Sequence, residues 1–457
     1  MTASTDSISV ALPSLAQTSP EVRDAARALV AAVRKASRSR SLSASAYQST
    51  LETLGKVRGQ PLALPLLSGG AGKGAFVQLA DGRRVLDLVS GIGPYVFGHD
   101  DQDLLETGAI AAAADVAFQG HVLPGLEYAR LCEALTRHAG ERFAHAWLSL
   151  SGSMANENAW KMILQHHAPA SEIITFEHAF HGRTLAMSEL TDRPEYREGL
   201  PEKTRVHRVP FFNADVPNST QTSLDALNQI LIEHEGRVAA MCFELVQGEG
   251  GFNAAPPAFF HALMKRCKAA GIAVWVDEIQ TFARTGELFA FRTLGLDRHV
   301  DLVTAGKVLH GSATLITQEY RPRPKLVAGT WAGATVGMAI GARVIERLEN
   351  EGHLGPEGGI ARLAQRLDMA FERLSERLPG VITKRSGLGA MQAFVVGDGD
   401  PQQTAEIIKA CLEEGVLLQP AGHHPIKIRL LPPLSLTDEE IEFGFAAIER
   451  GITRVIQ

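Results

Sequence analysis

The sequence predicts an α/β fold, with a large domain built on a mostly parallel sheet between helices and a smaller α/β domain beside it. Apolar runs of strand length alternate with helical patterns, which is typical of parallel sheets with crossover helices. Several of these runs end in polar or glycine-rich turns, where open α/β sheets bind ligands. A chain of 457 residues is too long for one compact core, so we expect a second domain.

The composition is that of an ordinary globular protein, with 45% hydrophobic and 21% charged residues. A net charge of −6 gives no reason to expect nucleic acid or an anionic membrane as a partner. The four cysteines are scattered without a CxxC pair, so we expect reduced thiols and no metal site. No apolar run reaches the ~18 residues of a membrane span, and the N-terminus lacks the apolar core of a secretory signal. A cytoplasmic enzyme is the simplest class.

Residues 1–94 are expected to form an N-terminal extension and part of the small domain. We expect residues 1 to about 19 to be disordered or loosely attached. A helix is predicted from Ser19, a serine N-cap followed by proline at the first helical position, to about Lys35. Farther on, two strand-like segments flank the Asp-Gly pair at 81–82, which predicts a hairpin with a tight turn.

The central segment, residues 95–335, contains most of the strand-and-turn pairs. One strand ends at Ser151 in a Ser-Gly-Ser turn, before a helix predicted over residues 155–166. Free N–H groups and the helix dipole at such a position favour phosphate, although a plain N-cap is more common. The polar, proline-containing stretch 191–213 is predicted to be a long surface connection. Further buried strands are predicted at 173–176, 238–243 and 272–276.

Asp277 and Lys307 are the strongest candidates for chemistry. Asp277 follows the strand 272–276, where a carboxylate that merely caps the next element is an equally good interpretation. Lys307 ends another strand-like run and is flanked by apolar and small residues. Its amine could therefore be partly desolvated and available to form a Schiff base.

The motif from Asp277 to Thr281, the motif from Arg284 to Ala290 and Lys307 together resemble the class III aminotransferases. These are fold-type-I enzymes that use pyridoxal 5'-phosphate. The resemblance runs from about Gly74 to the C-terminus. It implies a large cofactor-binding domain over residues 95–335, and a small domain to which residues 336–457 and the N-terminal segment contribute.

The resemblance assigns cofactor contacts to Ser151, Gly152, Ser153, Met154, Phe180, His181, Glu249, Asp277, Ile279, Gln280, Lys307 and Thr330. Lys307 would hold the cofactor covalently and move a proton as general base and acid. Asp277 would face the pyridine nitrogen, because an adjacent carboxylate favours the protonated ring that accepts electrons.

The remaining cofactor roles also follow from the resemblance. Phe180 and Ile279 would sandwich the ring, although Phe180 alone could be ordinary core. Gln280 would hydrogen-bond the ring hydroxyl. Thr330 would reach the phosphate of the neighbouring subunit, which implies a homodimer or a higher homo-oligomer. Two departures stand out: Met154 replaces an acid that is frequent in the family, and the loop after Gln280 is one residue shorter than usual.

Substrate contacts are implied for four residues. The loop containing Ile92 and Tyr95 approaches the substrate in the family, so both are candidate pocket walls, although they could equally be packing residues. Arg429 resembles the carboxylate clamp of the family, because guanidinium binds carboxylate bidentately. Alone it would more often be a surface ion-pair residue. An acid at the position of Glu249 pairs with this arginine in many members, masking the clamp while an ω-amine reacts and releasing it for glutamate.

The leading interpretation is therefore an aminotransferase that moves an amino group from an ω-amino acid or amine to a 2-oxo acid, with 2-oxoglutarate as the expected acceptor. Short motifs at 153–159, 306–311 and 330–331 are most similar to the 4-aminobutyrate and lysine 6-aminotransferase branches. An aminomutase, racemase or decarboxylase on the same cofactor remains an alternative, since a fold does not fix a reaction. A non-catalytic binding protein is a further alternative, against which the intact Lys307 and Asp277 argue.

Overall fold

The structure is a computed structural model that describes residues 19–38, 41–62, 64–114, 120 and 122–456. The expectation of disorder for the first residues therefore falls almost wholly outside the described residues. Among the helices of these ranges, none combines the length and the apolar character that crossing a bilayer requires.

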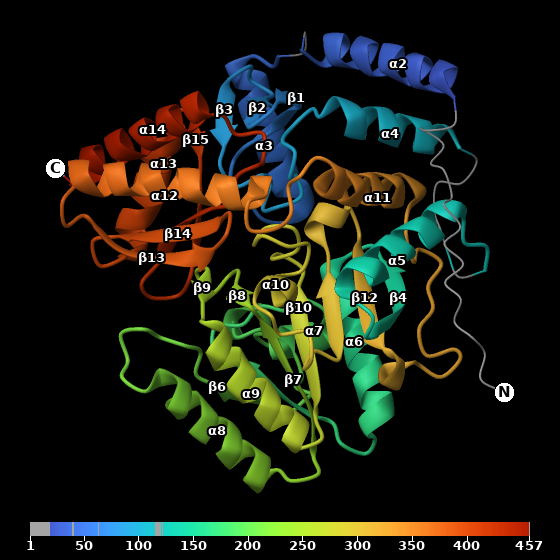
Figure 1. Cartoon of the computed structure of the whole chain (residues 1–457). Helices are drawn as coiled ribbons and strands as arrows, with labels where there is room; N and C mark the ends of the chain where they lie inside the picture. The colour runs from blue at the N-terminus through green and yellow to red at the C-terminus, as the bar shows by residue number, and fades with distance from the viewer. Residues whose placement is uncertain (1–18, 39–40, 63, 115–119, 121, 457) are drawn as a thin grey trace.

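A seven-stranded sheet forms the centre of the molecule (Figure 1). Its strands, in spatial order, are β4 (Phe143–Ser149), β12 (Ser312–Thr317), β11 (Leu302–Ala305), β10 (Ala273–Glu278), β7 (Val238–Glu244), β5 (Glu172–Phe176) and β6 (Val206–Val209). Only β12 runs antiparallel to its neighbours, and the other six strands share one direction. The mostly parallel sheet predicted from the sequence is thus confirmed.

Helices cover both faces of this sheet, which explains why its central strands are largely apolar. Val274 and Val276 of β10 face a core shared with α5 (Leu126–Ala139), α8 (Ser219–Glu233), α9 (Pro257–Ala269) and α11 (Thr335–Asn350). Ala273 and Trp275 point the other way, toward α6 (Gly152–His167) and α7 (Leu185–Leu190). This alternation is the two-residue period of a strand that is buried on both sides.

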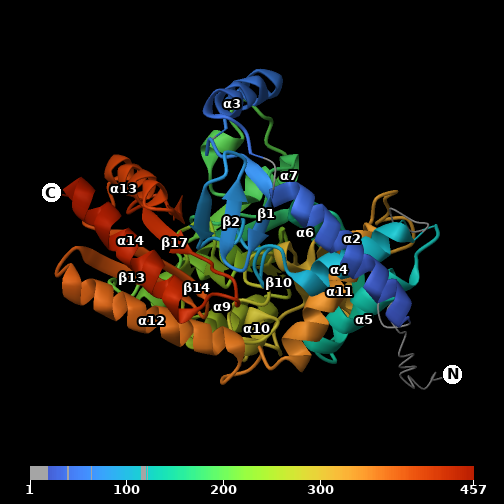
Figure 2. The same ribbon diagram turned by 90° about the horizontal axis from the view of Figure 1, so that it is seen from above.

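The two ends of the chain share a second core, in which Leu86 packs with Phe371 and Ile448. It joins the sheet β1 (Ser68–Lys73), β2 (Phe76–Leu79), β3 (Arg84–Asp87) and β15 (Val416–Leu417) to the sheet β13 (Ile382–Leu388), β14 (Met391–Val396), β17 (Lys427–Leu430) and β16 (Gln419–Ala421). Helices α12 (Gly359–Arg377), α13 (Pro401–Glu413) and α14 (Asp438–Ile456) lie against the second of these sheets (Figure 2). Helix α11 contributes Ile345 and Leu348 to the large core. The predicted domain boundaries at residues 94/95 and 335/336 stay a prediction.

Local signals placed several elements well. Helix α2 (Pro20–Arg38) begins after Ser19, whose Oγ accepts a hydrogen bond from the backbone N–H of Val22. In front of α14, Thr437 and Glu440 accept each other's backbone N–H groups, as a capping box requires. Helix α3 (Ala44–Arg58), with Ser43 as N-cap, projects from the molecule (Figure 2).

The prediction of a surface connection over residues 191–213 was wrong in part. Residues Val206–Val209 form β6, the edge strand that pairs in parallel with β5. The strand is only four residues long and contains the polar His207 and Arg208, so it shows no apolar run in the sequence. Its pairing with β5, and the packing of Val209 in the large core, define it as a strand.

Candidate active site

The parallel strands bring the candidate residues to one edge of the sheet. Asp277, near the carboxyl end of β10, pairs with Glu244 on β7 and with Thr304 on β11. One residue separates β11 from Lys307, and one residue separates β4 from Ser151 at the start of α6. Residues far apart in the sequence therefore meet where open α/β sheets bind ligands.

Asp277 is 4% exposed and is held by three donors. The side-chain amide of Asn156 donates to Oδ2 at 2.8 Å, and the backbone N–H of Ile279 donates to Oδ1 at 3.0 Å. Nδ1 of His181 lies 2.8 Å from Oδ2. The amide of Asn156 also donates to the backbone carbonyl of His181 at 2.7 Å, which fixes both donors. A buried carboxylate with this support keeps one orientation.

Lys307 lies across from Asp277 in a left-handed backbone conformation, with φ of 47°. Burial, aided by the positive charge of Arg429, lowers the pKa of its amine to about 8, although nearby carboxylates of Glu249, Glu244 and Asp277 oppose this shift. Gly93 packs on the lysine chain, since a Cβ there would lie 3.4 Å from Cδ of Lys307. An amine with this pKa is partly neutral near pH 8 and so is available as a nucleophile and as a base.

The start of α6 forms one wall of the site. Ser151 caps the helix, and its Oγ accepts the N–H of Met154 at 3.4 Å. Gly152 packs on Ile279 so closely that a Cβ would lie 2.9 Å from Cγ2 of that residue. Oγ of Ser153 accepts the N–H of Arg183 at 3.3 Å. These contacts bring the N–H groups of the first turn of the helix to the edge of the site, as an anion site requires.

A cavity of about 360 Å³ opens between these elements. Its lining includes eight residues that the sequence predicted: Ser151, Gly152, Ser153, Phe180, His181, Asp277, Ile279 and Lys307. A volume of a few hundred Å³ is typical of small-molecule sites.

Glu249 and Arg429 form an ion pair beside Lys307. The Nη1–Oε1 distance is 2.6 Å, and Nη2 of Arg429 donates to Oε1 of Gln419 at 3.1 Å. Burial alone would raise the pKa of the Glu249 carboxyl, but the charge and the hydrogen bond of Arg429 hold it below its ordinary value. The arginine side chain is 5% exposed and the glutamate side chain 27%, so the acid is the more accessible partner.

Gln280 is buried beside Gly248, where its Oε1 fills the place of the missing side chain. Its Nε2 is buried, with no hydrogen-bond partner within the described residues.

Four other predicted residues do not line the cavity. Met154 is 47% exposed, Thr330 is exposed, and Ile92 and Tyr95 belong to a loop that reaches Lys307 through Gly93 instead. The Tyr95 ring packs at a tilt against His99, with the centroids 4.3 Å apart, and Tyr95 lines a separate cavity of about 630 Å³.

Three residues at the site were not predicted from the sequence. Asn156 lies one helical turn after Gly152, a spacing that could have identified it. Glu244 ends β7, and burial together with the charge of Asp277 raises its pKa to about 8. Its carboxylate oxygens accept the backbone N–H groups of Phe180 and Gly248 at 2.9 and 2.8 Å. The third, Arg284, is 1% exposed and donates to the carbonyl oxygens of Gly93 and Pro432, a pairing that no local pattern indicates.

The cavity fits the cofactor that the sequence suggests. A planar pyridine ring would lie between Phe180 and Ile279, with its nitrogen toward Asp277. The first turn of α6 offers backbone donors to a phosphate, and the buried Nε2 of Gln280 lacks a hydrogen-bond partner among the described residues. Lys307 is the lysine that lines the cavity. The residues present therefore match the charge and the shape of pyridoxal 5'-phosphate.

Comparisons with known proteins identify the family of the chain. A family model described as aminotransferase class-III matches residues 64–452. The 2-aminoadipate transaminase of Pseudomonas putida is 32% identical over 405 residues, covering 84% of this chain and 95% of that protein. The acetylornithine aminotransferase of Thermosynechococcus vestitus is 32% identical over 400 residues, covering 84% of this chain and 92% of that protein.

Solved structures share the fold. A lysine aminotransferase from M. tuberculosis matches with a TM-score of 0.78 at 22% identity, covering 89% of this chain and 99% of that one. An omega-transferase from Vibrio fluvialis matches with a TM-score of 0.75 at 23% identity, covering 86% of this chain and 99% of that one. The family model spans most of the sequence, and the relatives exceed 30% identity. The chain therefore belongs to the class III aminotransferases, fold-type-I enzymes that depend on pyridoxal 5'-phosphate.

Proposed function

We propose that the chain moves an amino group from an ω-amino acid or amine to a 2-oxo acid, with 2-oxoglutarate as the acceptor, by a ping-pong mechanism. The observation that carries this proposal is the ion pair between Glu249 and Arg429 beside Lys307. In this proposal the Glu249 carboxylate pairs with the Arg429 guanidinium and can move away from it. Such a pair suits a site that must accept substrates with and without a carboxylate near the reacting carbon.

Most of the proposed cofactor contacts come from residues that line the cavity. The cofactor supplies a carbonyl that takes up the amino group and a ring that accepts electrons. Asp277 is proposed to face the ring nitrogen, held in place by His181 and Asn156. Phe180 and Ile279 hold the ring from its two faces. Gln280, His181 and Glu249 complete the proposed contacts to the cofactor and its surroundings.

Three small residues and one threonine are proposed to hold the phosphate. Ser151, Gly152 and Ser153 lie at the start of α6, where N–H groups and the helix dipole favour an anion. Met154 is a proposed neighbour of the cofactor, and its backbone N–H donates to Oγ of Ser151 at 3.4 Å. Thr330 is exposed and outside the cavity lining, so we propose that it serves the site of a neighbouring subunit.

Lys307 is the proposed catalytic base and acid. Its amine is buried beside carboxylates and has a pKa of about 8, so it can both accept and return a proton near neutral pH. Gly93 restricts the side chain from one side. Proton transfer at the carbon next to the amine is the step shared by transaminations, and Lys307 is the residue proposed to perform it.

The ion pair is proposed to select the substrate. With Glu249 paired to Arg429, the site presents no free guanidinium, and an ω-amine without a nearby carboxylate can react. When Glu249 swings away, Arg429 can bind the α-carboxylate of glutamate. Ile92 and Tyr95 are proposed as outer walls of the substrate pocket. An aminomutase needs no such carboxylate clamp for glutamate, so the pair favours transamination over this alternative.

A homodimer is the proposed assembly. Val122 and Leu123 are 98% and 80% exposed, and Trp331, next to Thr330, is 53% exposed. Large exposed apolar side chains of this kind mark interaction surfaces. We also propose a cytoplasmic location, which the four free cysteines support.

A donor screen tests the proposal. Purified holoenzyme is mixed with single amines, and the loss of the cofactor's carbonyl form is followed by absorbance in one turnover. 4-Aminobutyrate, lysine, acetylornithine and 2-aminoadipate form the panel, with alanine as the comparison. Regeneration by 2-oxoglutarate or by pyruvate then defines the acceptor. Turnover with an ω-amine and regeneration by 2-oxoglutarate support the proposal. Decarboxylation or racemisation of the donor without consumption of a 2-oxo acid contradicts it.

A further inference from the structure

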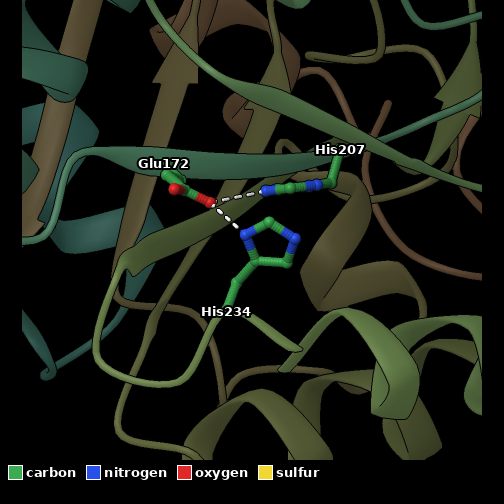
Figure 3. A group of neighbouring side chains, drawn as sticks. All are labelled: Glu172, His207 and His234. Carbon is green, nitrogen blue, oxygen red and sulfur yellow. Dashed lines mark hydrogen bonds and ion pairs between the residues drawn. The ribbon is translucent and has the colours of Figure 1, made fainter. Parts of the chain in front are cut away.

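A cluster of two histidines and one glutamate lies at the edge of the sheet opposite the candidate active site. Glu172 is the first residue of β5, His207 lies in β6, and His234 follows the last residue of α8 (Figure 3). Lys307, by contrast, follows the carboxyl end of β11, which has the same direction as β5. The cluster is therefore separate from the cofactor cavity.

The three side chains converge on one oxygen. Nε2 of His207 and Nδ1 of His234 each lie 2.7 Å from Oε2 of Glu172 (Figure 3). The candidate ligand atoms all lie within 4.8 Å of one another. The side chains are 11%, 12% and 10% exposed, in the order Glu172, His207 and His234, so the cluster is shielded but water can still reach it.

The backbone holds this arrangement rigidly. His207 pairs directly with Ile174, and Ile174 shares a strand face with Glu172, so the glutamate and His207 are diagonal neighbours on one face. The backbone N–H of Glu172 donates to the carbonyl of Arg237 at 3.0 Å, and the N–H of Arg237 donates to the carbonyl of His234 at 3.0 Å. Three separate elements are thus fixed around the cluster.

One ring nitrogen has no hydrogen bond. Nδ1 of His234 is buried, and despite its proximity to Glu172 it has no hydrogen-bond partner with acceptable geometry within the described residues. Imidazole nitrogens and carboxylate oxygens are ligands that Zn²⁺ and related ions prefer.

We propose that Glu172, His207 and His234 bind a divalent transition-metal ion, with Zn²⁺ as the representative, and that water completes the coordination. Ligand atoms around a tetrahedral Zn²⁺ at ~2.1 Å are ~3.4 Å apart, so the side chains must separate by about 0.7 Å to admit the ion. Small side-chain rotations achieve this. The bound ion would join the end of α8 to the edge strand β6.

Arg237 gives the proposal a distinctive signature. Its Nη1 lies 3.6 Å from Oε1 of Glu172, the oxygen that does not face the histidines, and its side chain is 50% exposed. Its positive charge opposes a bound cation. Arg237→Gln should therefore tighten metal binding several-fold, whereas a cluster that serves only to hold β5 and β6 together would gain no metal affinity from this change.

Calorimetric titration of holoenzyme, freed of metal by a chelator, with ZnCl₂ at pH 7 tests the site. We expect one equivalent per chain, a raised melting temperature with Zn²⁺, and an affinity loss of roughly 100-fold for His234→Ala or His207→Ala. His261→Ala, which alters a histidine pair with ring centroids 5.7 Å apart, is the matched control and should bind Zn²⁺ normally. Arg237→Gln leaves the three proposed ligands intact, so it still tests the site if the histidine variants misfold. Absence of the one-equivalent binding event, its persistence in both histidine variants, or weaker binding by Arg237→Gln overturns the proposal.

Discussion

Glu249 and Arg429, 180 residues apart in the sequence, are joined by a 2.6 Å contact between Oε1 and Nη1. The glutamate lies in the turn between β8 (Val246–Gln247) and β9 (Asn253–Ala254), and the arginine lies in β17 of the smaller core. Nε of Arg429 is buried, with no hydrogen-bond partner in the described part of the chain. A buried guanidinium with spare donors has a strong demand for carboxylate, which Glu249 meets only in part.

Arg429→Ala should slow the half-reaction with glutamate far more than that with a simple ω-amine. Hydrogen bonds to charged groups contribute about 1.5–3 kcal/mol, so the loss for glutamate should be roughly 10- to 150-fold. Single-turnover absorbance changes measure both half-reactions directly. Glu249→Ala should do the reverse, because it leaves Arg429 exposed to α-amino acids.

Gln419 supplies a matched control. Its side chain accepts a hydrogen bond from Arg429 at 3.1 Å, and its replacement by alanine leaves the net charge of the site unchanged. Gln419→Ala should affect both half-reactions only slightly. An equal loss of both half-reactions in Arg429→Ala would show that the arginine is structural and that the switch does not operate.

Lys307→Ala should abolish the covalent link to the cofactor. Lys307 is the lysine that lines the cavity, and its lowered pKa favours reaction with a carbonyl. Borohydride reduction of the wild-type holoenzyme should fix the cofactor to this residue, as peptide mass mapping can show. Mapping of the adduct to another lysine would falsify the assignment of the site.

The lowered pKa of Lys307 also predicts a pH dependence of stability. In the cofactor-free protein its pKa is about 8, against an ordinary value of 10.5, so between these pH values the unfolded chain binds more protons than the folded one. The free energy of unfolding therefore rises with pH across this window. Below pH 8, burial of the charged amine costs about 3 kcal/mol.

Lys307→Met should remove this cost. The cofactor-free variant should be more stable than the cofactor-free wild type at pH 7, and the gain should vanish near pH 10.5. Urea unfolding of both proteins over this range measures the difference. Lys265→Met, at an exposed position of α9, is the control and should show no such trend. A constant difference between Lys307→Met and the wild type at all pH values would mean that the amine is not desolvated.

The sequence indicated the parts of the site that depend on one segment at a time. Asp277 and Lys307 each end a strand, and parallel strands all end at the same edge, so their proximity followed from the fold class. The turn at Ser151 carried its own helix-start signal. These are local sequence patterns, and the positions of their residues at one edge of the sheet follow once the sheet is parallel.

Contacts that join distant segments left no such pattern. The partnership of Arg284 with the carbonyls of Gly93 and Pro432 depends on how the smaller core sits on the large one. The raised pKa of Glu244 results from its burial and then from its register beside Asp277. His207 gave no signal either, because the short polar strand β6 is defined by its partner β5 and not by its own residues.

The placement of Thr330 yields a prediction about the assembly. The residue is exposed and does not line the cavity of its own chain, so a phosphate contact from it must cross between subunits. Thr330→Ala should weaken cofactor binding by roughly 10- to 150-fold, the range for a hydrogen bond to a charged group. Equilibrium dialysis of the cofactor measures this. Light scattering should show at least a dimer, and a fully active monomer would contradict the assembly.

Mixed dimers decide whether the contact crosses the interface. A dimer of one Lys307→Ala chain and one Thr330→Ala chain has two different sites. If Thr330 acts across the interface, the site with an intact Lys307 receives its threonine from the Lys307→Ala chain, so one site is complete and the other carries both defects. If Thr330 acts within its own chain, each site carries one defect and none is complete. Differently tagged chains, purified as the mixed dimer, should therefore regain tight cofactor binding and wild-type turnover at half of their sites. Failure to regain either one would place the threonine contact within a single chain or remove it from the site.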